Sequence, residues 1–206
     1  MAVTLGHGAL AARWPKAPHG LIDAVVEKWP SISAEFGINT PARAQMFMAQ
    51  LSHECGGGTI TEENLRYSAK RMTQVWPRRF PTIAAATPYA FNPKALANKT
   101  YGGRMGNRPG TDDGWNYRGR GLIQITGRDG YAQVGKRAGI DLVNHPEDAN
   151  NPMTALRVAA AFWDWKGLNA WADKGNYLQV TKLINGGTNG WDDRVWWLNR
   201  WKGVFK

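Results

Sequence analysis

Residues 40–58, which read TPARAQMFMAQLSHECGGG, decide the fold of this chain. Thr40 followed by Pro41 is a typical helix start, because a threonine hydroxyl can cap free backbone N–H groups and proline fits the first helical position. The apolar residues that follow share one face of an α-helix: Ala44, Phe47, Met48, Leu51 and Cys55. Three glycines then end the pattern. The segment predicts a buried amphipathic helix that stops at a sharp turn.

Similar patterns predict further helices. One over 151–167 begins with Asn-Pro, and one over 177–184 is followed by the two glycines of a helix end. Weaker patterns predict helices over 21–29, 68–80, 130–138 and 192–201. Residues 88–121, rich in Gly, Asn, Pro and Arg, indicate long irregular connections, and alternating β patterns are scarce. The predicted fold class is mainly α.

The composition is that of one folded domain. The chain has 206 residues, 43% of them hydrophobic and 20% charged, which suffices for one buried core. We expect a single domain over residues 1–206, because no repeat or low-complexity tract marks a second one. No run approaches the roughly 20 apolar residues of a membrane span, and residues 1–21 lack the pattern of an export signal. The single cysteine excludes an internal disulfide, so the fold does not depend on an oxidising compartment.

The positive charge is concentrated in the middle of the chain. The net charge is +10, and residues 66–128 hold twelve Lys and Arg against two Asp, whereas the remainder holds fourteen charges of each sign. A field of this kind attracts polyanions such as nucleic acid, an anionic membrane surface or an acidic cell wall. The alternative is a solvated basic surface without a dedicated partner.

The helix over 40–55 carries a carboxylate in its last turn. Glu54 lies three residues after Leu51 and seven after Phe47, beside the apolar stripe, so we expect it to be half-buried. Burial disfavours the charged form of a carboxyl group, as a general acid near neutral pH requires, and the following glycines let a ligand approach the backbone. Alternatively, Glu54 is a surface residue whose charge opposes the dipole at a helix end.

Glu62 and Glu63 are candidates for a second carboxylate. In a continuous helix, Glu54 and Glu63 would lie on opposite faces. The turn at 56–58 breaks that continuity and can return Glu63 across a cleft, where an inverting glycosidase needs its carboxyl groups roughly 6.5 to 9.5 Å apart. Spacing alone does not rank Glu62 against Glu63.

Metal and thiol chemistry are disfavoured. His53 and Glu54 lack the HExxH continuation, and the other histidines are scattered without ligand spacing, so we predict no metal site. Cys55 lies on the apolar stripe, and we interpret it as a core residue instead of a nucleophile.

Polar and aromatic residues further along the chain are candidates for a substrate groove. In an extended segment Gln124 and Thr126 would share one face, which lines either a groove or a buried strand with locally satisfied polar groups. Asn185 either supports a turn or holds a substrate group through its amide. Trp115 and Tyr117 are candidates for stacking on sugar rings. Helical spacing predicts core positions for three other tryptophans: Trp163, Trp196 and Trp197.

Four stretches, taken in order, resemble glycoside hydrolase family 19, the chitinase-like lysozyme family that includes many bacteriophage endolysins. They are AQLSHE at 49–54, ENLRYSA at 63–69, YRGRGLIQIT at 117–126 and INGG at 184–187. The resemblance runs from about Thr40 to Arg200. It implies a mainly α, lysozyme-like, two-lobed fold with a substrate cleft, and an inverting reaction without a cofactor.

The motif match also implies roles for individual residues. Glu54 would be the general acid that protonates the leaving glycosidic oxygen, and Glu63, which precedes Asn-Leu as in the endolysin members, would be the base that activates water. Thr126 falls where the family places a Ser or Thr that helps to hold this water. The predicted substrate-binding residues are His53, Tyr67, Trp115, Tyr117, Gln124 and Asn185. The short link at 188–190 and the single cysteine depart from plant-type members, which leaves Arg194 without an assigned role.

The resemblance and the charge together favour peptidoglycan glycan strands as the partner, because the bacterial wall is anionic and chitin is neutral. They imply an endolysin that hydrolyses β-1,4 glycosidic bonds and causes host lysis. We expect it to accumulate in the host cytoplasm without a signal peptide and to reach the periplasmic wall once the inner membrane is permeabilised. We further expect a monomer with no separate wall-binding module, no metal, no cofactor and no stable membrane insertion.

Two alternatives stay open. The first is a chitinase acting on poly-N-acetylglucosamine, which would share the acid and the base. The second is a non-catalytic basic module that binds the wall or nucleic acid. Nucleic acid is disfavoured because no helix-turn-helix or RNA-binding motif is present and the arginines are dispersed among glycines. The presence of both Glu54 and Glu63 argues against a module without catalysis.

Overall fold

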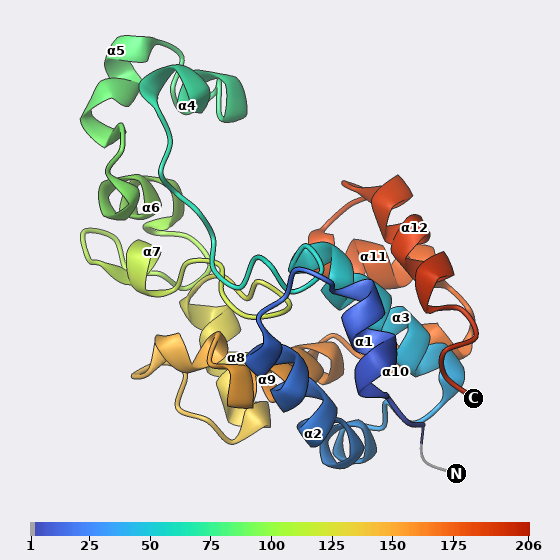
Figure 1. Cartoon of the computed structure of the whole chain (residues 1–206). Helices are drawn as coiled ribbons and strands as arrows, with labels where there is room; N and C mark the ends of the chain where they lie inside the picture. The colour runs from blue at the N-terminus through green and yellow to red at the C-terminus, as the bar shows by residue number, and fades with distance from the viewer. Residues whose placement is uncertain (1–2) are drawn as a thin grey trace.

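A computed structural model describes residues 3–206, and it shows two helical lobes (Figure 1). The larger lobe contains α1 (His7–Arg13), α2 (His19–Glu35), α3 (Pro41–Glu54), α8 (Arg128–Ala138), α9 (Pro152–Trp165), α10 (Leu168–Asp173), α11 (Tyr177–Asn185) and α12 (Trp191–Trp201). The smaller lobe contains α4 (Ala69–Val75), α5 (Ile83–Ala86), α6 (Pro93–Tyr101) and α7 (Asp113–Asn116). Two short 3-10 helices lie at Thr87–Tyr89 and Pro146–Ala149. The prediction of a mainly α, two-lobed fold is confirmed.

The larger lobe is built around α3. Helix α12 packs along α3, and α9 packs against both α2 and α8. Phe47 and Leu51, on the predicted apolar face of α3, are fully buried, and the ring of Phe47 meets Trp163 edge-to-face with centroids 5.4 Å apart. Because this face is anchored in the core, the last turn of α3 is held at the surface of the lobe with little freedom.

A buried serine joins three segments of this core. The hydroxyl of Ser52 accepts hydrogen bonds from the indole N–H groups of Trp14 and Trp201, at 2.8 and 2.9 Å, and donates to the carbonyl of Met48 at 2.6 Å. The hydroxyl thereby uses its one donor and both acceptor sites. The contact fixes the residues around α1 and the end of α12 against α3.

The smaller lobe has a separate core. Its buried residues are Leu65, Met72, Phe80, Ala86, Leu96 and Ala97. Aromatic rings cover this core, with Tyr67 against Trp76 at a centroid distance of 5.1 Å and Phe80 against Tyr89 at 5.5 Å. The lobe is therefore packed by its own side chains.

The strongest helix predictions are confirmed by the caps. The hydroxyl of Thr40 accepts a hydrogen bond from the backbone N–H of Arg43 at 3.3 Å, and the side chain of Asn151 accepts one from Met153 at 3.0 Å. Gly186 ends α11 in the left-handed conformation with φ of 74°. Helices α3, α9 and α11 begin within one residue of the predicted positions.

Proline misleads the prediction at two other helices. Helix α2 continues through Pro30 to Glu35, because Ile32 beyond the proline is buried and its packing outweighs the lost hydrogen bond. Helix α4 ends at Val75 and not near Phe80, because Trp76 precedes Pro77 and adopts a non-helical conformation. Helix α1 was not predicted.

Part of the region predicted to be irregular is helical. Helix α6 begins after Asn92, whose side chain accepts a hydrogen bond from the N–H of Ala95 at 3.2 Å. Leu96 and Ala97 of α6 are fully buried in the core of the smaller lobe. The pattern over nine residues is short and weakly apolar, so only its packing partners reveal it.

Two of the three core tryptophans are confirmed and one prediction is wrong. Trp163 and Trp197 are 1% and 9% exposed, whereas Trp196 is 50% exposed. Trp196 and Trp197 are adjacent on α12, so the two side chains point about 100° apart and only one of them can face the core.

Cys55 is fully buried, as predicted for a core residue. Burial raises the pKa of its thiol to about 12, so it stays protonated at neutral pH.

Across residues 3–206, no helix combines the length and the apolar character that crossing a membrane requires.

Candidate active site

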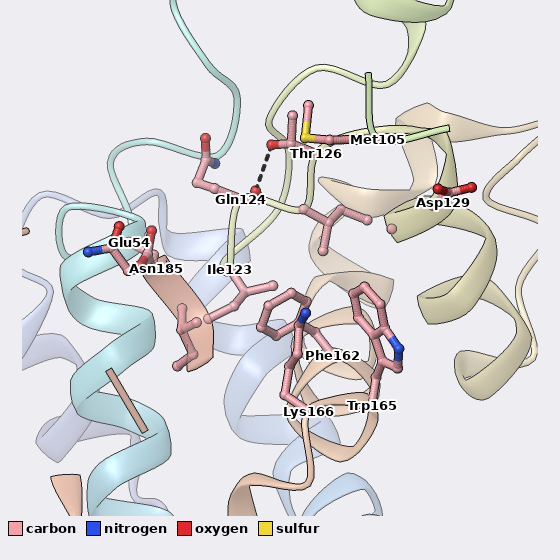
Figure 2. Close-up of a pocket in the computed structure, with 13 residues that line it drawn as sticks. Glu54, Met105, Ile123, Gln124, Thr126, Asp129, Phe162, Trp165, Lys166 and Asn185 are labelled. Carbon is pink, nitrogen blue, oxygen red and sulfur yellow. Dashed lines mark hydrogen bonds between the residues drawn. The ribbon is translucent and has the colours of Figure 1, made fainter. Parts of the chain in front are cut away.

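A pocket of about 400 Å³ opens beside the last turn of α3 (Figure 2). Four of the predicted site residues line it: Glu54, Gln124, Thr126 and Asn185. They come from α3, from the segment before α8 and from the end of α11, so the fold joins residues that are far apart in sequence. The remaining wall includes Met105, Asp129, Phe162, Trp165 and Lys166.

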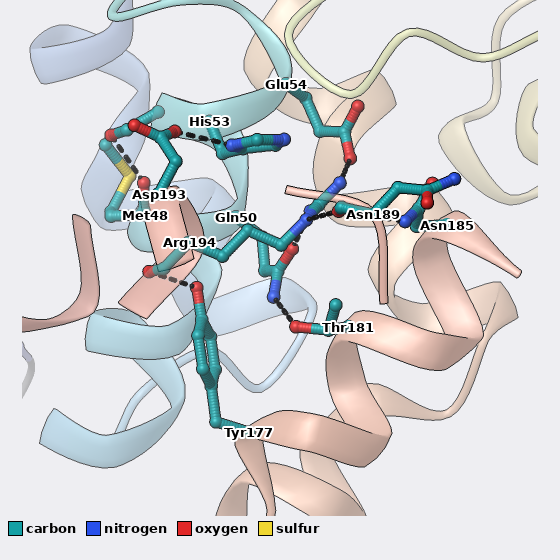
Figure 3. A network of polar contacts seen from close by, with 11 residues as sticks. Met48, Gln50, His53, Glu54, Tyr177, Thr181, Asn185, Asn189, Asp193 and Arg194 are labelled. Atoms are coloured by element: carbon teal, nitrogen blue, oxygen red, sulfur yellow. Dashed lines mark hydrogen bonds and ion pairs between the residues drawn. The ribbon is translucent and has the colours of Figure 1, made fainter. Parts of the chain in front are cut away.

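Glu54 is held by a buried arginine (Figure 3). Its carboxylate, with a side chain only 18% exposed, accepts a hydrogen bond from Arg194 at 2.5 Å, and the Arg194 side chain is 2% exposed. Arg194 also donates to the side chain of Gln50 and to the carbonyl of Asn189. Gln50 in turn donates to the hydroxyl of Thr181 at 2.7 Å. This network fixes the Glu54 side chain between α3, α11 and α12.

The sequence left Arg194 without a role, although its position contains the information. Arg194, Trp197 and Trp201 are spaced at i, i+3 and i+7 on α12, which is the face that packs on α3. An arginine on a buried face needs a carboxylate or several acceptors, because an unpaired buried charge is strongly unfavourable. The contact with Glu54 satisfies this need and stabilises the carboxylate that remains after Glu54 releases a proton.

Glu63 is held by two donors from the other lobe and the connecting segment. One carboxylate oxygen accepts a hydrogen bond from the phenol of Tyr101 at 2.6 Å, and the other accepts one from the N–H of Gly119 at 3.3 Å. Burial and the negative charge of Glu63 both raise the pKa of Tyr101 well above its usual range. The phenol therefore stays protonated and remains a donor.

The glycine turn after α3 brings Glu63 to this position. Gly58 has φ of 82°, and a Cβ atom there would lie 2.6 Å from the Cβ of Ala17, so only glycine fits. Beyond the turn, the chain pairs with the segment at 119–121: the N–H of Gly121 donates to Thr61 at 2.8 Å, and the N–H of Glu63 donates to Gly119 at 2.9 Å. The predicted break of helical continuity is confirmed.

Glu63, the predicted base, does not line the pocket itself, but it lies close to Gln124, which does. A Cβ atom on Gly119 would lie 3.0 Å from the amide oxygen of Gln124 and 3.5 Å from a carboxylate oxygen of Glu63. Gly119 therefore separates Glu63 from Gln124, which lines the pocket. Because residue 119 has no side chain, only backbone atoms of Gly119 stand between Glu63 and Gln124.

Gln124 and Thr126 reach the pocket from a tight turn, so the prediction of an extended segment is wrong. Gln124 has φ of 53°, a conformation that is uncommon outside glycine and asparagine, and its amide donates to the carbonyl of Gly121 at 2.9 Å. The hydroxyl of Thr126 donates to the carbonyl of Gln124 at 3.0 Å (Figure 2). Backbone strain of this kind concentrates at functional sites.

His53 and Tyr117, two predicted substrate-binding residues, do not line the pocket. His53 lies against the first turn of α12 and makes a 2.6 Å contact with Asp193 (Figure 3). Tyr117 is 5% exposed and its phenol donates to the carbonyl of Val143 at 2.9 Å. Since its ring is covered, Tyr117 offers no free face for a sugar, which corrects the prediction.

Trp115 and Tyr67 also lie outside the pocket. The guanidinium of Arg118 stacks on Trp115, 3.6 Å from the ring centroid. Tyr67 packs on Trp76 in the smaller lobe. Both rings are partly exposed, so they remain candidates for contacts with a long substrate.

Sequence reasoning missed several residues of the pocket wall, among them Asp129, Trp165 and Lys166. Lys166 lies over the ring of Trp165, 3.8 Å from the centroid, at the end of α9, and burial lowers the pKa of Lys166. Trp165 and Lys166 follow the buried Phe162 by three and four residues, so they extend the apolar face of α9 by one turn. This spacing was the signal in the sequence that could have identified them. Asp129, exposed in the first turn of α8, is a second carboxylate on the wall. In residues 3–206, no three His, Cys, Asp or Glu side chains gather as a metal site would require.

Glu62 has different partners from Glu63. It pairs with Arg118 and lies 3.9 Å from Arg120, and these two arginine side chains are only 10% and 8% exposed. Burial, followed by the charge of Arg120, lowers the pKa of Arg118, so a nearby carboxylate is needed to compensate both cations. The structure therefore favours a structural function for Glu62 and leaves Glu63 as the carboxylate that lies close to the pocket residue Gln124.

Replacing Tyr101 with phenylalanine is expected to lower kcat about tenfold, because one of the two donors that orient Glu63 is lost. The measurement is steady-state kinetics on a soluble glycan fragment together with the melting temperature. Tyr117→Phe is the matched control, since it also removes one hydrogen bond of a covered tyrosine but contacts no carboxylate. If both variants lose equal activity, the hydrogen bond to Glu63 has no special function.

Comparisons with known proteins show the family to which the chain belongs. Residues 21–175 match the model of glycoside hydrolase family 19, which is described as "Chitinase class I". A "Glycosyl hydrolase family 19 domain-containing protein" of Haemophilus influenzae is 41% identical over 175 residues, covering 83% of this chain and 86% of the relative. Endochitinase 2 of Gossypium hirsutum is 26% identical over 173 residues, 72% of this chain and 51% of that protein.

Solved structures show the same fold. Chitinase C of Streptomyces griseus HUT6037 superposes with a TM-score of 0.59 at 18% identity, covering 97% of this chain and 91% of that one. A structure titled as a bacterial family 19 chitinase gives a TM-score of 0.58 at 19% identity, covering 96% and 94%. The family match over most of the chain and the bacterial relative identify the protein as a glycoside hydrolase, and the chain therefore belongs to glycoside hydrolase family 19.

Proposed function

We propose that this glycoside hydrolase cleaves the β-1,4 glycosidic bonds of bacterial peptidoglycan by an inverting mechanism, with Glu54 as the acid and Glu63 as the base. The observation that carries the proposal is the placement of these two carboxylates. Glu54 lines the pocket and is held by Arg194, whereas Glu63 is held by Tyr101 and lies beside Gly119, close to the pocket residue Gln124.

The geometry supports the following chemistry. Glu54 gives its proton to the leaving glycosidic oxygen as the bond between that oxygen and the anomeric carbon breaks. A water molecule attacks the anomeric carbon from the opposite face and gives a proton to Glu63. In this reaction the hydroxyl of Thr126 and the amide of Gln124, which both belong to the pocket wall, help to hold the water. Arg194 stabilises the carboxylate left on Glu54, and solvent then returns the proton.

Two observations support peptidoglycan over chitin as the substrate. The excess of positive charge lies in residues 66–128, which form the smaller lobe, its connections to the larger lobe and the turn beside the pocket. Lys166 places a cation on the pocket wall itself. The glycan of peptidoglycan carries the carboxylates of its stem peptides, or of the lactyl groups where the peptide is absent, whereas chitin is neutral, so these cations favour the wall polymer. Chitin is the alternative substrate, because several relatives are named chitinases.

We further propose that the protein acts as an endolysin, which is synthesised in a host cytoplasm and reaches the periplasmic wall after the inner membrane is permeabilised. The proposal rests on the four endolysin-like sequence stretches and the basic charge. Expression in a Gram-negative host should leave the culture intact until a membrane-permeabilising agent is added, followed by rapid lysis. Lysis of the culture without the agent would contradict this route.

The products of digestion test the substrate and the mechanism together. Purified peptidoglycan should yield disaccharide-peptides by mass spectrometry, and nuclear magnetic resonance during the reaction should show the α-anomer at the new reducing end. Chitin oligosaccharides under the same conditions serve as the control. A β-anomer as first product would rule out Glu63 as the base of an inverting reaction. Efficient cleavage of chitin with intact peptidoglycan would show that the protein is a chitinase.

A further inference from the structure

A second pocket, of about 480 Å³, lies where the segment after α1 meets the end of α12. Its wall includes Arg13, Lys16, Trp196 and Arg200, and the backbone of Gly56 contributes to it. It shares no residue with the pocket that contains Glu54. No residue assigned to catalysis above contributes to this second pocket.

Two of its cations are fixed close together. The side chain of Arg13 donates to the carbonyl of Arg200 at 2.7 Å, and the side chain of Arg200 donates to the carbonyl of Ala12 at 3.2 Å. Burial and the charge of Arg200 lower the pKa of Arg13, so the two like charges repel each other. Backbone carbonyls hold them in place against this repulsion.

No carboxylate compensates these cations. Within residues 3–206, none lies within 4.0 Å of Arg13, Lys16 or Arg200, although surface arginines elsewhere are paired, such as Arg43 with Asp173. The wall of the pocket also contains no acidic residue. Concentrated positive charge without a counter-ion, in a concave site, favours an anion.

Trp196 adds an aromatic surface to this positive pocket. It is 50% exposed, while the guanidinium of Arg200 lies 4.8 Å from its ring centroid and Trp197 meets it edge-on at 4.8 Å. These contacts orient the indole and leave half of its surface open. An exposed tryptophan held in one orientation is a suitable platform for a sugar ring.

We propose that this pocket is an accessory binding site for a carboxylate-bearing sugar segment of the bacterial wall. The sugar ring lies against Trp196, and its carboxylate lies among Arg13, Lys16 and Arg200. The identity of the polymer rests on the proposed function, but binding at this site does not require catalysis. A second site on the same chain keeps the enzyme attached to an insoluble polymer and raises the effective concentration at the active site.

Binding to purified peptidoglycan sacculi tests this site. The double variant Trp196→Ala/Lys16→Gln is made in a Glu54→Gln background that does not digest the sacculi, and bound protein is measured by sedimentation. We expect at least about tenfold weaker binding, because an aromatic anchor and a charge are both removed. In the active background, cleavage of a short soluble glycan fragment should change less than about twofold. Met153→Ala/Lys136→Gln is the matched control, since it removes the same charge and an exposed apolar side chain outside residues 66–128 and away from both pockets.

Chemical modification identifies the group that is bound. Amidation of the sacculus carboxylates should weaken binding of the parent by a larger factor than binding of the double variant, because only the parent keeps Lys16 and Trp196 in this pocket. Equal binding of parent, double variant and control to native sacculi would overturn the proposal. The proposal would also be overturned if the double variant lost binding to anionic phospholipid vesicles or to DNA while its binding to sacculi stayed unchanged. If the parent binds sacculi through this pocket but cleaves only chitin, the accessory site stands and the proposed function fails.

Discussion

Replacing Glu54 with glutamine is expected to lower the rate of glycan cleavage about 1000-fold, within the range that a general acid contributes. The amide has nearly the same shape, and its oxygen can still accept the hydrogen bond from Arg194. It cannot give a proton to the leaving glycosidic oxygen. The measurement is kcat/KM for the release of reducing ends from peptidoglycan, with the melting temperature as a check on folding.

Glu62→Gln is the matched control for this experiment, because it makes the same chemical change on a carboxylate that faces Arg118 and Arg120 instead of the pocket. It should retain most of the activity and lose some stability. Full activity of the Glu54 variant would show that another group protonates the leaving oxygen. A comparable loss in both variants, with lowered melting temperatures, would indicate a folding defect and not the loss of an acid.

Replacing Arg194 with methionine is expected to reduce both activity and stability. The substitution leaves Glu54 and the side-chain oxygen of Gln50 without their buried donor, and breaking a buried ion pair from one side costs about 3 kcal/mol or more. The free energy of unfolding is measured in urea, and kcat on a soluble fragment is measured well below the melting temperature. Activity should fall at least about 100-fold, because the carboxylate loses both its orientation and its stabilising charge.

A double-mutant cycle separates the two effects of Arg194. Because Glu54→Gln removes the charge that Arg194 compensates, adding Arg194→Met to it should cost less stability than Arg194→Met alone. Additive losses of stability would mean that Arg194 acts on the fold through its contacts with Gln50 and Asn189 and not through Glu54. Arg194→Lys, which keeps the charge but reaches fewer acceptors, should fall between the parent and the methionine variant.

The acid candidate and the class of fold were accessible from the sequence because both depend on local pattern. The stripe from Ala44 to Cys55 fixed which face of α3 is buried, and this placed Glu54 at the boundary of the core. The caps at Thr40 and Asn151 located two helix starts within one residue. These features involve neighbours along the chain, where residue type and spacing are sufficient.

The failures have a common physical cause. Trp196 was judged by helical spacing and Tyr117 by residue type and local composition, whereas exposure depends on which segment packs against each of them. Gln124 was assigned an extended conformation because the alternation of its neighbours fits a strand, but the pairing of 119–121 with 61–63 and the turn at Gly121 impose a left-handed backbone. Asp129, Trp165 and Lys166 enter the pocket through helices that start or end there. The local pattern records the spacing of Trp165 and Lys166 on α9, but not the pocket that packing forms beside them.

The sequence by itself thus determined a mainly helical fold, one buried helix with a carboxylate at its end, and a turn that lets a second carboxylate return. Only the tertiary structure decided which charges meet. Arg194 reaches Glu54 across 140 residues, and Tyr101 reaches Glu63 across 38. Such contacts depend on how helices from distant parts of the chain pack, because a buried charge is stable only where its partner has been brought to it.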